Sequence, residues 1–425
     1  MSRIAFIDLL FHWPPTGGSW VDLKEIVSQA QMAGHEVKLF VPHFDKYFPR
    51  GVIRQSLPFE VEALDFDKNT FNAKILPKTF RDRIKAYKPD CIFVGDGDYL
   101  KPLLINALGG DYRIILRIYS HEILCFRKSM YLMPDFKRGM WNPFNVGPCN
   151  NHLLVDSERC FRCFFSGWQI PLIKAMVGTG LSLNALHYPH EYLAAKAYVE
   201  DYVEEVRKCF DHVSDVIVYN HFMAGLLSRF HNKIHVIPSG IDVAHFDIPA
   251  SKNTGAVKHI LMPGRVTDPL KGFKVLLGAA KILRRQRQDF KVLVTFPFGK
   301  QASTPTYVEN VGWWAQDALP LLYQKADIVV APALWQEPFG IIPLEAMSCR
   351  RPVVVSRLGG HLVTVVSGET GIFFSPGDRE DLAEKLASLL NSHNLRNQMG
   401  ENGRQRVLKN YTWESIMVKY YKDIF

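Results

Sequence analysis

Short apolar runs alternate with amphipathic stretches along most of the chain. Runs such as Ile4–Ile7 and Ile328–Ala331 contain no polar residue, which is typical of strands buried on both faces of a parallel sheet. The stretches between them space apolar residues three and four apart, as in the helix expected between Gly18 and the stop signal at Gly34. We therefore expect strands at 4–7, 35–41, 89–95, 114–119, 214–219, 234–237, 259–262, 292–296, 311–312, 328–331, 352–356 and 372–374.

The alternation occurs twice, with a break at Pro238-Ser239-Gly240 and a polar stretch at 250–257. This predicts an α/β protein with two Rossmann-like, doubly wound domains that face each other across a cleft, where the site is expected. The expected domains are residues 1–236 and 237–408. A final helix at 409–425 is expected to pack back toward the first domain.

The amino-acid composition excludes few classes of protein. The 425 residues are 47% hydrophobic and 22% charged, with a net charge of +9, which suits a mildly basic globular protein of two domains. An anionic ligand, an anionic membrane surface or nucleic acid are the alternative explanations of the charge. The basic residues are scattered rather than gathered in long runs, so the charge alone favours none of these partners.

Nothing in the sequence predicts export. The apolar run Ile4–Phe11 is short and lacks a small-residue cleavage site, and no run is long enough to span a bilayer. Seven cysteines spread over this length argue against a secreted disulfide framework. We expect a cytoplasmic location. The sequence does not indicate an oligomeric state.

The most informative stretch runs from Pro332 to Pro352. It follows a predicted buried strand and leads through a turn rich in Gly and Pro into a helix, with Pro343 expected as the first helical residue. Such a helix N-terminus suits an anion, here with the N–H groups of Phe339, Gly340 and Ile341 facing it. Two glutamates flank the turn, Glu337 and Glu345. Their carboxylates can accept hydrogen bonds from the hydroxyl groups of a ligand.

A second strand-to-helix turn of the same half carries two cations, Arg265 and Lys271. Fixed cations at such a turn can bind a diphosphate, although two solvated loop charges are the simpler explanation of this segment taken alone. In the first half, Gly17-Gly18 precedes a helix and would let a backbone approach a phosphate, or serve as an ordinary loop. His121 follows a predicted strand at its carboxyl end, where ligands bind, or is a surface histidine.

Two further segments of the first half allow more than one function. From Phe126 to Trp141 basic residues alternate with large apolar ones, as in a loop that grips an acceptor or touches lipid headgroups, or one that covers a core. The cluster Cys149, His152, Cys160 and Cys163 has one pair at metal-ligand spacing, so it is a weak zinc candidate beside the alternative of free reduced thiols.

The segment Glu337–Ala346, Glu-Pro-Phe-Gly-Ile-Ile-Pro-Leu-Glu-Ala, resembles the paired-glutamate motif of retaining glycosyltransferases with the GT-B fold, of the family-4 type (glycosyl transferases group 1). The chain also resembles that family's landmarks, in its order, at Gly17-Gly18 with Gly34–Val37, at Val236–Asp242, and at Pro263–Arg265 with Lys271-Gly272. The resemblance covers almost the whole chain and is most specific in the second half.

The resemblance implies retaining transfer of a hexosyl group from a nucleoside-diphosphate sugar, with UDP favoured over GDP. The implied acceptor is a saccharide or a lipid-linked molecule in cell-surface polysaccharide synthesis, with peripheral contact to the inner face of the membrane. The first domain would serve the acceptor and the second the donor. No cofactor and no metal ion are implied, because two protein cations take the metal's place.

Residue roles follow from the same resemblance. Arg265 and Lys271 would bind the donor diphosphate, Glu345 the ribose and Glu337 the donor sugar, with His121 near the reacting centre. The donor-binding set would also include Gly17, Gly18, Phe339, Gly340 and Ile341. Two departures concern the nucleotide-base contacts: Arg350-Arg351 stands where a glycine is usual, and Phe296–Gly299 replaces a glycine-rich turn.

Two other classes of function stay open. One is a protein that keeps the nucleotide-sugar site but does not transfer, against which the intact charged residues argue. The other is a zinc-bearing nucleic-acid-binding protein, which lacks a recognised nucleic-acid motif in this sequence. The donor sugar, base, acceptor and linkage are not indicated.

Overall fold

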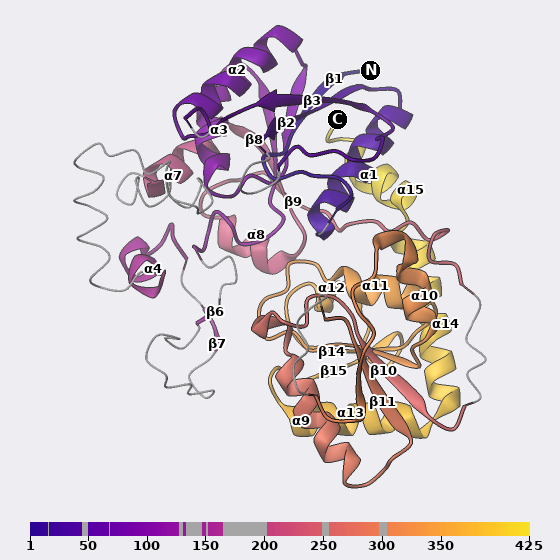
Figure 1. Cartoon of the computed structure of the whole chain (residues 1–425). Helices are drawn as coiled ribbons and strands as arrows, with labels where there is room; N and C mark the ends of the chain where they lie inside the picture. Colours follow the sequence, from indigo (N-terminus) through magenta and orange to yellow (C-terminus); the bar gives the residue numbers. More distant parts are fainter. Residues whose placement is uncertain are drawn as a thin grey trace. The chain divides into compact units, whose positions relative to one another are not determined.

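The chain divides into two compact units, Met1–Ile237 with Met417–Phe425, and Pro238–Ile416 (Figure 1). The computed structural model describes residues 1–15, 17–44, 50–67, 69–126, 131–132, 147–149, 152–164, 202–248, 255–296 and 304–425. The unit boundary lies one residue from the expected division at 236, while the acceptor and donor roles of the two halves stay predictions. No helix in the described part is long and apolar enough to cross a membrane.

Unit 1 is built on a seven-stranded parallel sheet in the order β3-β2-β1-β4-β5-β8-β9. Its central strands are the uninterrupted apolar runs, and Ile4 to Ile7 are fully buried. Its strands are β1 (Arg3–Ile7), β2 (Glu36–His43), β3 (Glu60–Asp65), β4 (Cys91–Val94), β5 (Arg113–Arg117), β8 (Val213–Val218) and β9 (Ile234–Val236).

Helices and two minor elements complete unit 1. The predicted stop at Gly34 is confirmed, because α1 ends at Met32 and Gly34 has φ +92°. The elements are α1 (Gly18–Met32), α2 (Ile75–Tyr87), the 3₁₀ turn η1 (Asp98–Leu100), α3 (Lys101–Leu108), α4 (Ser157–Phe164), α7 (Tyr202–His212), α8 (His221–Leu227) and a small antiparallel pair, β6 (Tyr131–Leu132) with β7 (Gly147–Pro148).

Unit 2 has a six-stranded parallel sheet in the order β12-β11-β10-β13-β14-β15. Alternate residues of each strand face opposite sides, so Ile260, Ile328 and Val354 join a core with α9 and α13. The strands are β10 (Lys258–Met262), β11 (Phe290–Val294), β12 (Val308–Asn310), β13 (Ile328–Ala331), β14 (Val353–Ser356) and β15 (Gly371–Phe374).

The helices of unit 2 are α9 (Phe273–Arg284), α10 (Leu319–Gln324), α11 (Ile341–Ser348), α12 (His361–Thr364), α13 (Arg379–Asn391), α14 (His393–Asn410) and α15 (Trp413–Ile416), with 3₁₀ turns η5 (Pro269–Lys271) and η6 (Gln316–Ala318). The expected cap of α13 is confirmed, because Asp378 Oδ1 accepts from the Asp381 N–H at 2.9 Å.

The carboxyl end carries the expected helix, whose predicted cap is Thr412, and this helix starts later than residue 409. Helix α14 continues to Asn410, and a new helix is capped by the Thr412 hydroxyl, which accepts from the Ser415 N–H at 3.1 Å. After α15 the chain continues as a π-helix, Met417–Tyr421, and these residues belong to unit 1. Helix α14 ends at Asn410, and Thr412, two residues later, caps the next helix.

Helix α11 begins two residues earlier than expected. Gly340 is its cap, with φ +84°, and Ile341 is the first helical residue, so Pro343 stands third. Glu345 is therefore the fifth residue of the helix. The early start aims the first N–H groups of α11 toward the end of β13.

Gly272 brings the turn after β10 against the loop after β13. It has φ +79°, and a Cβ added to it would lie 1.8 Å from the carbonyl oxygen of Pro332. The same contact is held by a hydrogen bond from the Leu334 N–H to the Leu270 carbonyl at 2.8 Å. Only glycine fits here, since the position requires both a left-handed backbone and an absent side chain.

We expect Gly272→Ala to lower the free energy of unfolding of unit 2 by about 3 kcal/mol, because backbone strain and a steric clash add. Gly368→Ala is the matched control: its φ is also +79°, but a Cβ there meets nothing within 4 Å. The control should cost only about 1 kcal/mol of strain. Equal losses for the two variants in urea denaturation would contradict the close approach at Gly272.

Candidate functional site

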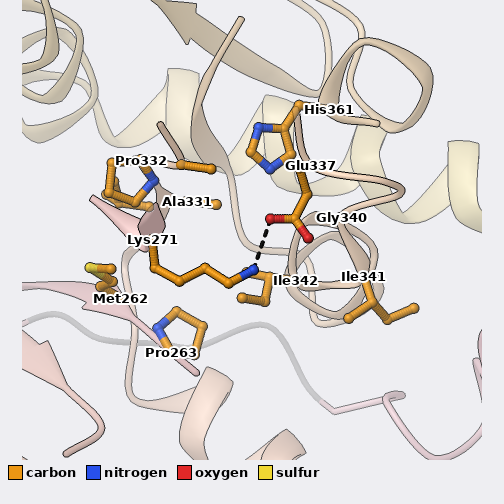
Figure 2. A pocket seen from close by; sticks show the side chains of 12 residues that line it. Met262, Pro263, Lys271, Ala331, Pro332, Glu337, Gly340, Ile341, Ile342 and His361 are labelled. Atoms are coloured by element: carbon orange, nitrogen blue, oxygen red, sulfur yellow. Dashed lines mark hydrogen bonds and ion pairs between the residues drawn. The ribbon is translucent and has the colours of Figure 1, made fainter. Parts of the chain in front are cut away.

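A partly buried ion pair joins the two turns that the sequence singled out. Lys271, from the turn after β10, places Nζ 2.8 Å from Oε2 of Glu337, which follows β13 (Figure 2). The indole N–H of Trp335 donates to the same oxygen at 2.8 Å. The Lys271 ammonium also lies 5.1 Å from the centre of the Trp335 ring, within cation–π range.

Glu337 is ionised although its side chain is only 15% exposed. Burial alone would raise the pKa of Glu337, but Lys271, His361 and the Trp335 hydrogen bond outweigh it, so that pKa lies below its usual value. For His361, burial lowers the pKa and Glu337 opposes the shift. Glu337 is thus a carboxylate at neutral pH, held by one cation and one neutral donor.

Two glycines of the loop after β14, Gly359 and Gly360, pack against the backbone of the loop that carries Glu337. The Gly360 N–H donates to the Glu337 carbonyl at 2.6 Å. A Cβ on Gly359 would lie 2.2 Å from that same carbonyl oxygen, and one on Gly360 would lie 2.1 Å from the Phe339 carbonyl oxygen. The loop after β14 therefore fits against the Glu337 loop only because it lacks side chains at these two positions.

The ion pair lines a pocket at the carboxyl ends of β10 and β13, with about 440 Å³ of empty volume that is partly open to solvent (Figure 2). Its walls are mostly apolar, and the first residues of α11 close one side. Neither Gly340 nor Ile341 donates its N–H within the described residues. The lining residues are Met262, Pro263, Lys271, Val330, Ala331, Pro332, Ala333, Glu337, Gly340, Ile341, Ile342 and His361.

Arg265 lies next to this pocket in the chain but does not line it. Its side chain is exposed and forms no hydrogen bond or ion pair with the described residues. Its neighbour Gly264 contacts the first turn of α11, where a Cβ would lie 3.4 Å from Ile342 Cδ1. A guanidinium on this turn can extend toward a ligand without breaking an existing contact.

Glu345 does not line the pocket. It is 6% exposed, and the Tyr323 hydroxyl of α10 donates to its Oε2 at 2.5 Å. Burial raises the pKa of Glu345 to about 7, although the Tyr323 hydrogen bond lowers it. Phe339 is also buried and does not line the pocket. Of the expected donor set in this unit, Lys271, Glu337, Gly340 and Ile341 meet in one place.

The two arginines that depart from the family pattern serve the fold. Arg350 adopts the left-handed conformation that favours glycine, with φ +55°, and donates to Asp247 Oδ1 at 2.9 Å. Arg351 donates to the Tyr323 carbonyl at 3.1 Å. Both therefore tie α11 to its surroundings. The other departure, at 297–299, lies outside the described residues.

The sequence-predicted residues of unit 1 lie at the start of α1 and after β5. Gly17 caps α1, and Gly18 is its first residue. His121 is fully buried after β5, beside an ion pair between Lys101 Nζ and Glu122 Oε1 at 2.8 Å. That pair and a hydrogen bond from the Ser120 hydroxyl to Glu122 Oε2 hold the turn that carries His121.

The four residues of the cysteine cluster lie within the described ranges, and their zinc-binding role stays a prediction. No three His, Cys, Asp or Glu side chains within the described ranges, which include these four residues, are arranged to hold a metal ion. His152 instead packs against Phe230, with ring centroids 5.8 Å apart. Burial raises the pKa of Cys160 to about 12, with Cys125, Cys149 and Cys163 adding to the shift, so it is a neutral thiol. Most of the 126–141 loop lies outside the described residues.

Sequence reasoning missed three side chains of this region: Trp335, Tyr323 and His361. Trp335 stands two residues before Glu337, so its place in the loop could have been noticed. His361 directly follows Gly359-Gly360 at the end of a predicted strand, which is where ligands bind in such sheets. The partnership of Tyr323 with Glu345 carries no local signal.

Known proteins resemble the chain in both sequence and structure. Residues 246–406 match the family described as glycosyl transferases group 1. An uncharacterized glycosyltransferase of Methanocaldococcus jannaschii is 31% identical over 204 residues, 44% of this chain and 52% of that protein. A D-inositol 3-phosphate glycosyltransferase of Corynebacterium efficiens is 30% identical over 279 residues, 58% of this chain and 63% of that protein.

The alignments thus span about half to two thirds of those two relatives. Among solved structures, HepE of Anabaena in complex with UDP-glucose superposes with a TM-score of 0.65, at 15% identity, over 100% of this chain and 99% of that one. At this identity the likeness establishes the fold, two Rossmann-like α/β domains of the GT-B type. Residues 246–406 thus resemble the glycosyl transferases group 1 family, while the likeness over the whole chain concerns the fold.

Proposed function

We propose that this protein is a retaining glycosyltransferase that moves a sugar from a nucleoside-diphosphate sugar to a saccharide or lipid-linked acceptor. The observation that carries the proposal is the meeting of Lys271 and Glu337 in a pocket against the first turn of α11. A cation and a helix N-terminus suit the phosphates, and a carboxylate beside them suits the hydroxyls of the attached sugar.

The chemistry follows from where charge grows. As the sugar leaves through an oxocarbenium-like state, negative charge develops on the departing phosphate. Lys271, Arg265 and the N–H groups of Gly340 and Ile341 would stabilise that charge from fixed positions. Glu337, which stays ionised, would hold the sugar hydroxyls and favour the cationic ring. Two protein cations make a metal ion unnecessary in this proposal.

The burial of Lys271 and Glu337 gives each of them a reason to pair with the other. Each is less than one fifth exposed, so either charge alone would be costly to bury. A bound diphosphate gives Lys271 a second anionic partner, and sugar hydroxyls give Glu337 new donors. Each charge therefore keeps a partner in both states.

We favour UDP over GDP as the nucleotide. HepE of Anabaena, which shares the fold, is solved with UDP-glucose, which supports this choice. The acceptor proposed, in cell-surface polysaccharide synthesis at the cytoplasmic face of a membrane, rests on the family resemblance and on the basic and aromatic residues between Phe126 and Trp141.

A thermal-shift series with UDP, GDP and ADP, each alone and as sugar conjugates, tests the proposal. Stabilisation by one nucleotide and a further rise with one of its sugars is the expected result. A protein that binds the donor but transfers to no acceptor would be the non-catalytic alternative. If no nucleotide raises the melting temperature, both the transferase and the non-catalytic binding protein are contradicted.

The first prediction concerns the cations. Lys271→Ala and Arg265→Ala should each lower kcat about a hundredfold or more, because each removes one preorganised charge from the leaving phosphate. Arg265→Ala should change the free energy of unfolding by less than about 0.5 kcal/mol, since its side chain is exposed. Lys281→Ala, an exposed lysine on α9, is the control. Near-normal turnover in both variants would disprove the diphosphate assignment.

The second prediction separates sugar from nucleotide. Glu337→Gln keeps an acceptor for the Trp335 N–H but removes the charge, so it should abolish most transfer while UDP affinity in calorimetry stays within about threefold. Loss of UDP binding in this variant would show that Glu337 serves the nucleotide instead.

The third prediction uses the raised pKa of Glu345, about 7. If its carboxylate accepts the ribose hydroxyls, the proton must leave on binding, so UDP-glucose affinity should fall as pH drops from 8 to 6, with its midpoint near that pKa. Tyr323→Phe removes the hydrogen bond that lowers this pKa, so the midpoint should move up. UDP-glucose is the proper probe because its phosphates do not titrate in this range. An affinity that is flat between pH 6 and 8 in both proteins speaks against Glu345 as the ribose ligand.

A further inference from the structure

The His361 ring is held in one orientation beside the loop that carries Glu337. It is the first residue of α12, follows Gly359-Gly360, and is 1% exposed. Its Nδ1 lies 3.0 Å from the backbone carbonyl oxygen of Ser356. A carbonyl can only accept, so Nδ1 carries a hydrogen. In the neutral ring the lone pair is therefore on Nε2.

The Nε2 edge of the ring faces the pocket wall. A Cβ added to Gly340 would lie 2.8 Å from His361 Cδ2 and 3.3 Å from Nε2, so this edge abuts the start of α11. The ring lines the same pocket as Lys271 and lies beside the Glu337 side chain (Figure 2). Nε2 makes no hydrogen bond with any described residue, whereas Nδ1 is engaged.

The surroundings keep the ring neutral. Burial lowers the pKa of His361 and the Lys271 ammonium lowers it too, against the opposite effects of Glu337 and the Ser356 carbonyl. These are the groups that bear on the ring, and Glu337 is itself compensated by Lys271. At neutral pH the pocket therefore contains two acceptors side by side, one carboxylate and one imidazole nitrogen.

We propose that Nε2 of His361 accepts a hydrogen bond from a hydroxyl group of the donor sugar, next to the hydroxyls held by Glu337, and so helps to select that sugar. This inference rests on the proposed function. Two adjacent acceptors require donors, so the sugar edge that meets them must carry hydroxyl groups. A carboxylate on that edge, as in a uronic acid, would be repelled by Glu337.

Calorimetry with and without the sugar tests this role. The quantity measured is the ratio of the dissociation constants of UDP and UDP-glucose, or of GDP and GDP-mannose if thermal shift selects that pair. In His361→Phe this ratio should shift by about tenfold against the sugar, the size of one good hydrogen bond, while affinity for UDP or GDP alone is unchanged. His361→Gln, whose amide can both donate to Ser356 and accept from the sugar, should recover part of the loss.

The variant is expected to fold. The Ser356 carbonyl also accepts from the Leu358 N–H at 2.8 Å, so losing Nδ1 leaves no unpaired carbonyl. His393→Phe, an exposed histidine on α14, is the matched control and should change neither affinity. An unchanged ratio in His361→Phe with normal nucleotide affinity overturns the role of His361 alone. A wild-type protein that binds none of these nucleotides overturns the proposed function and this inference with it.

Nitrogen NMR of labelled protein gives a readout that a purely structural role would not produce. At pH 7.5 the His361 Nε2 resonance should be that of an unprotonated nitrogen, and it should move when UDP-glucose is added but not when UDP is added. A protonated Nε2 in the free protein, or a resonance that responds equally to both ligands, contradicts the proposal.

Discussion

The site depends on one close approach: the turn that carries Lys271 lies directly against the loop that carries Glu337. Gly272 makes this possible, because any side chain there would overlap the Pro332 carbonyl oxygen. Gly359 and Gly360 make a second approach from the loop after β14. The loops that follow β10, β13 and β14 of the same parallel sheet therefore meet at one place, next to the start of α11.

Charge balance explains the arrangement of side chains around that point. Glu337 is mostly buried yet ionised because Lys271 and Trp335 both satisfy it, whereas burial keeps His361 beside it neutral although Glu337 favours the charged ring. Glu345 has no cation and relies on the Tyr323 hydroxyl, so its pKa rises instead. Two glutamates of one motif thereby acquire different protonation behaviour, which fits the separate roles that we propose for them.

Sequence patterns were sufficient for the interior of both sheets and missed or misplaced one edge strand of each. Central strands such as β13 are buried on both faces and read as unbroken apolar runs. The edge strand β3 carries charged residues along its length and was not predicted, and β12 was expected three residues too late. Edge strands have neighbours on one side only, so their sequences carry a weaker signal.

The residues of the candidate site also divide into those that the sequence predicted and those that it did not. Lys271 and Glu337 were identifiable because each follows a strand in a turn of distinctive composition. The start of α11 was misplaced because Pro343 suits a first helical position, while Gly340 in a left-handed conformation supplies the actual cap. The contacts of His361 and Tyr323 join residues distant in the chain, which no local pattern encodes.

The central claim is that a nucleoside-diphosphate sugar occupies the pocket formed by Lys271 and Glu337. Hydrogen–deuterium exchange of the full chain, with and without saturating UDP-glucose or GDP-mannose, tests it most directly. The account predicts slower exchange in peptides covering 263–272 and 337–345, and no change in α14. Binding accompanied by protection elsewhere, with those two segments unaffected, would contradict it.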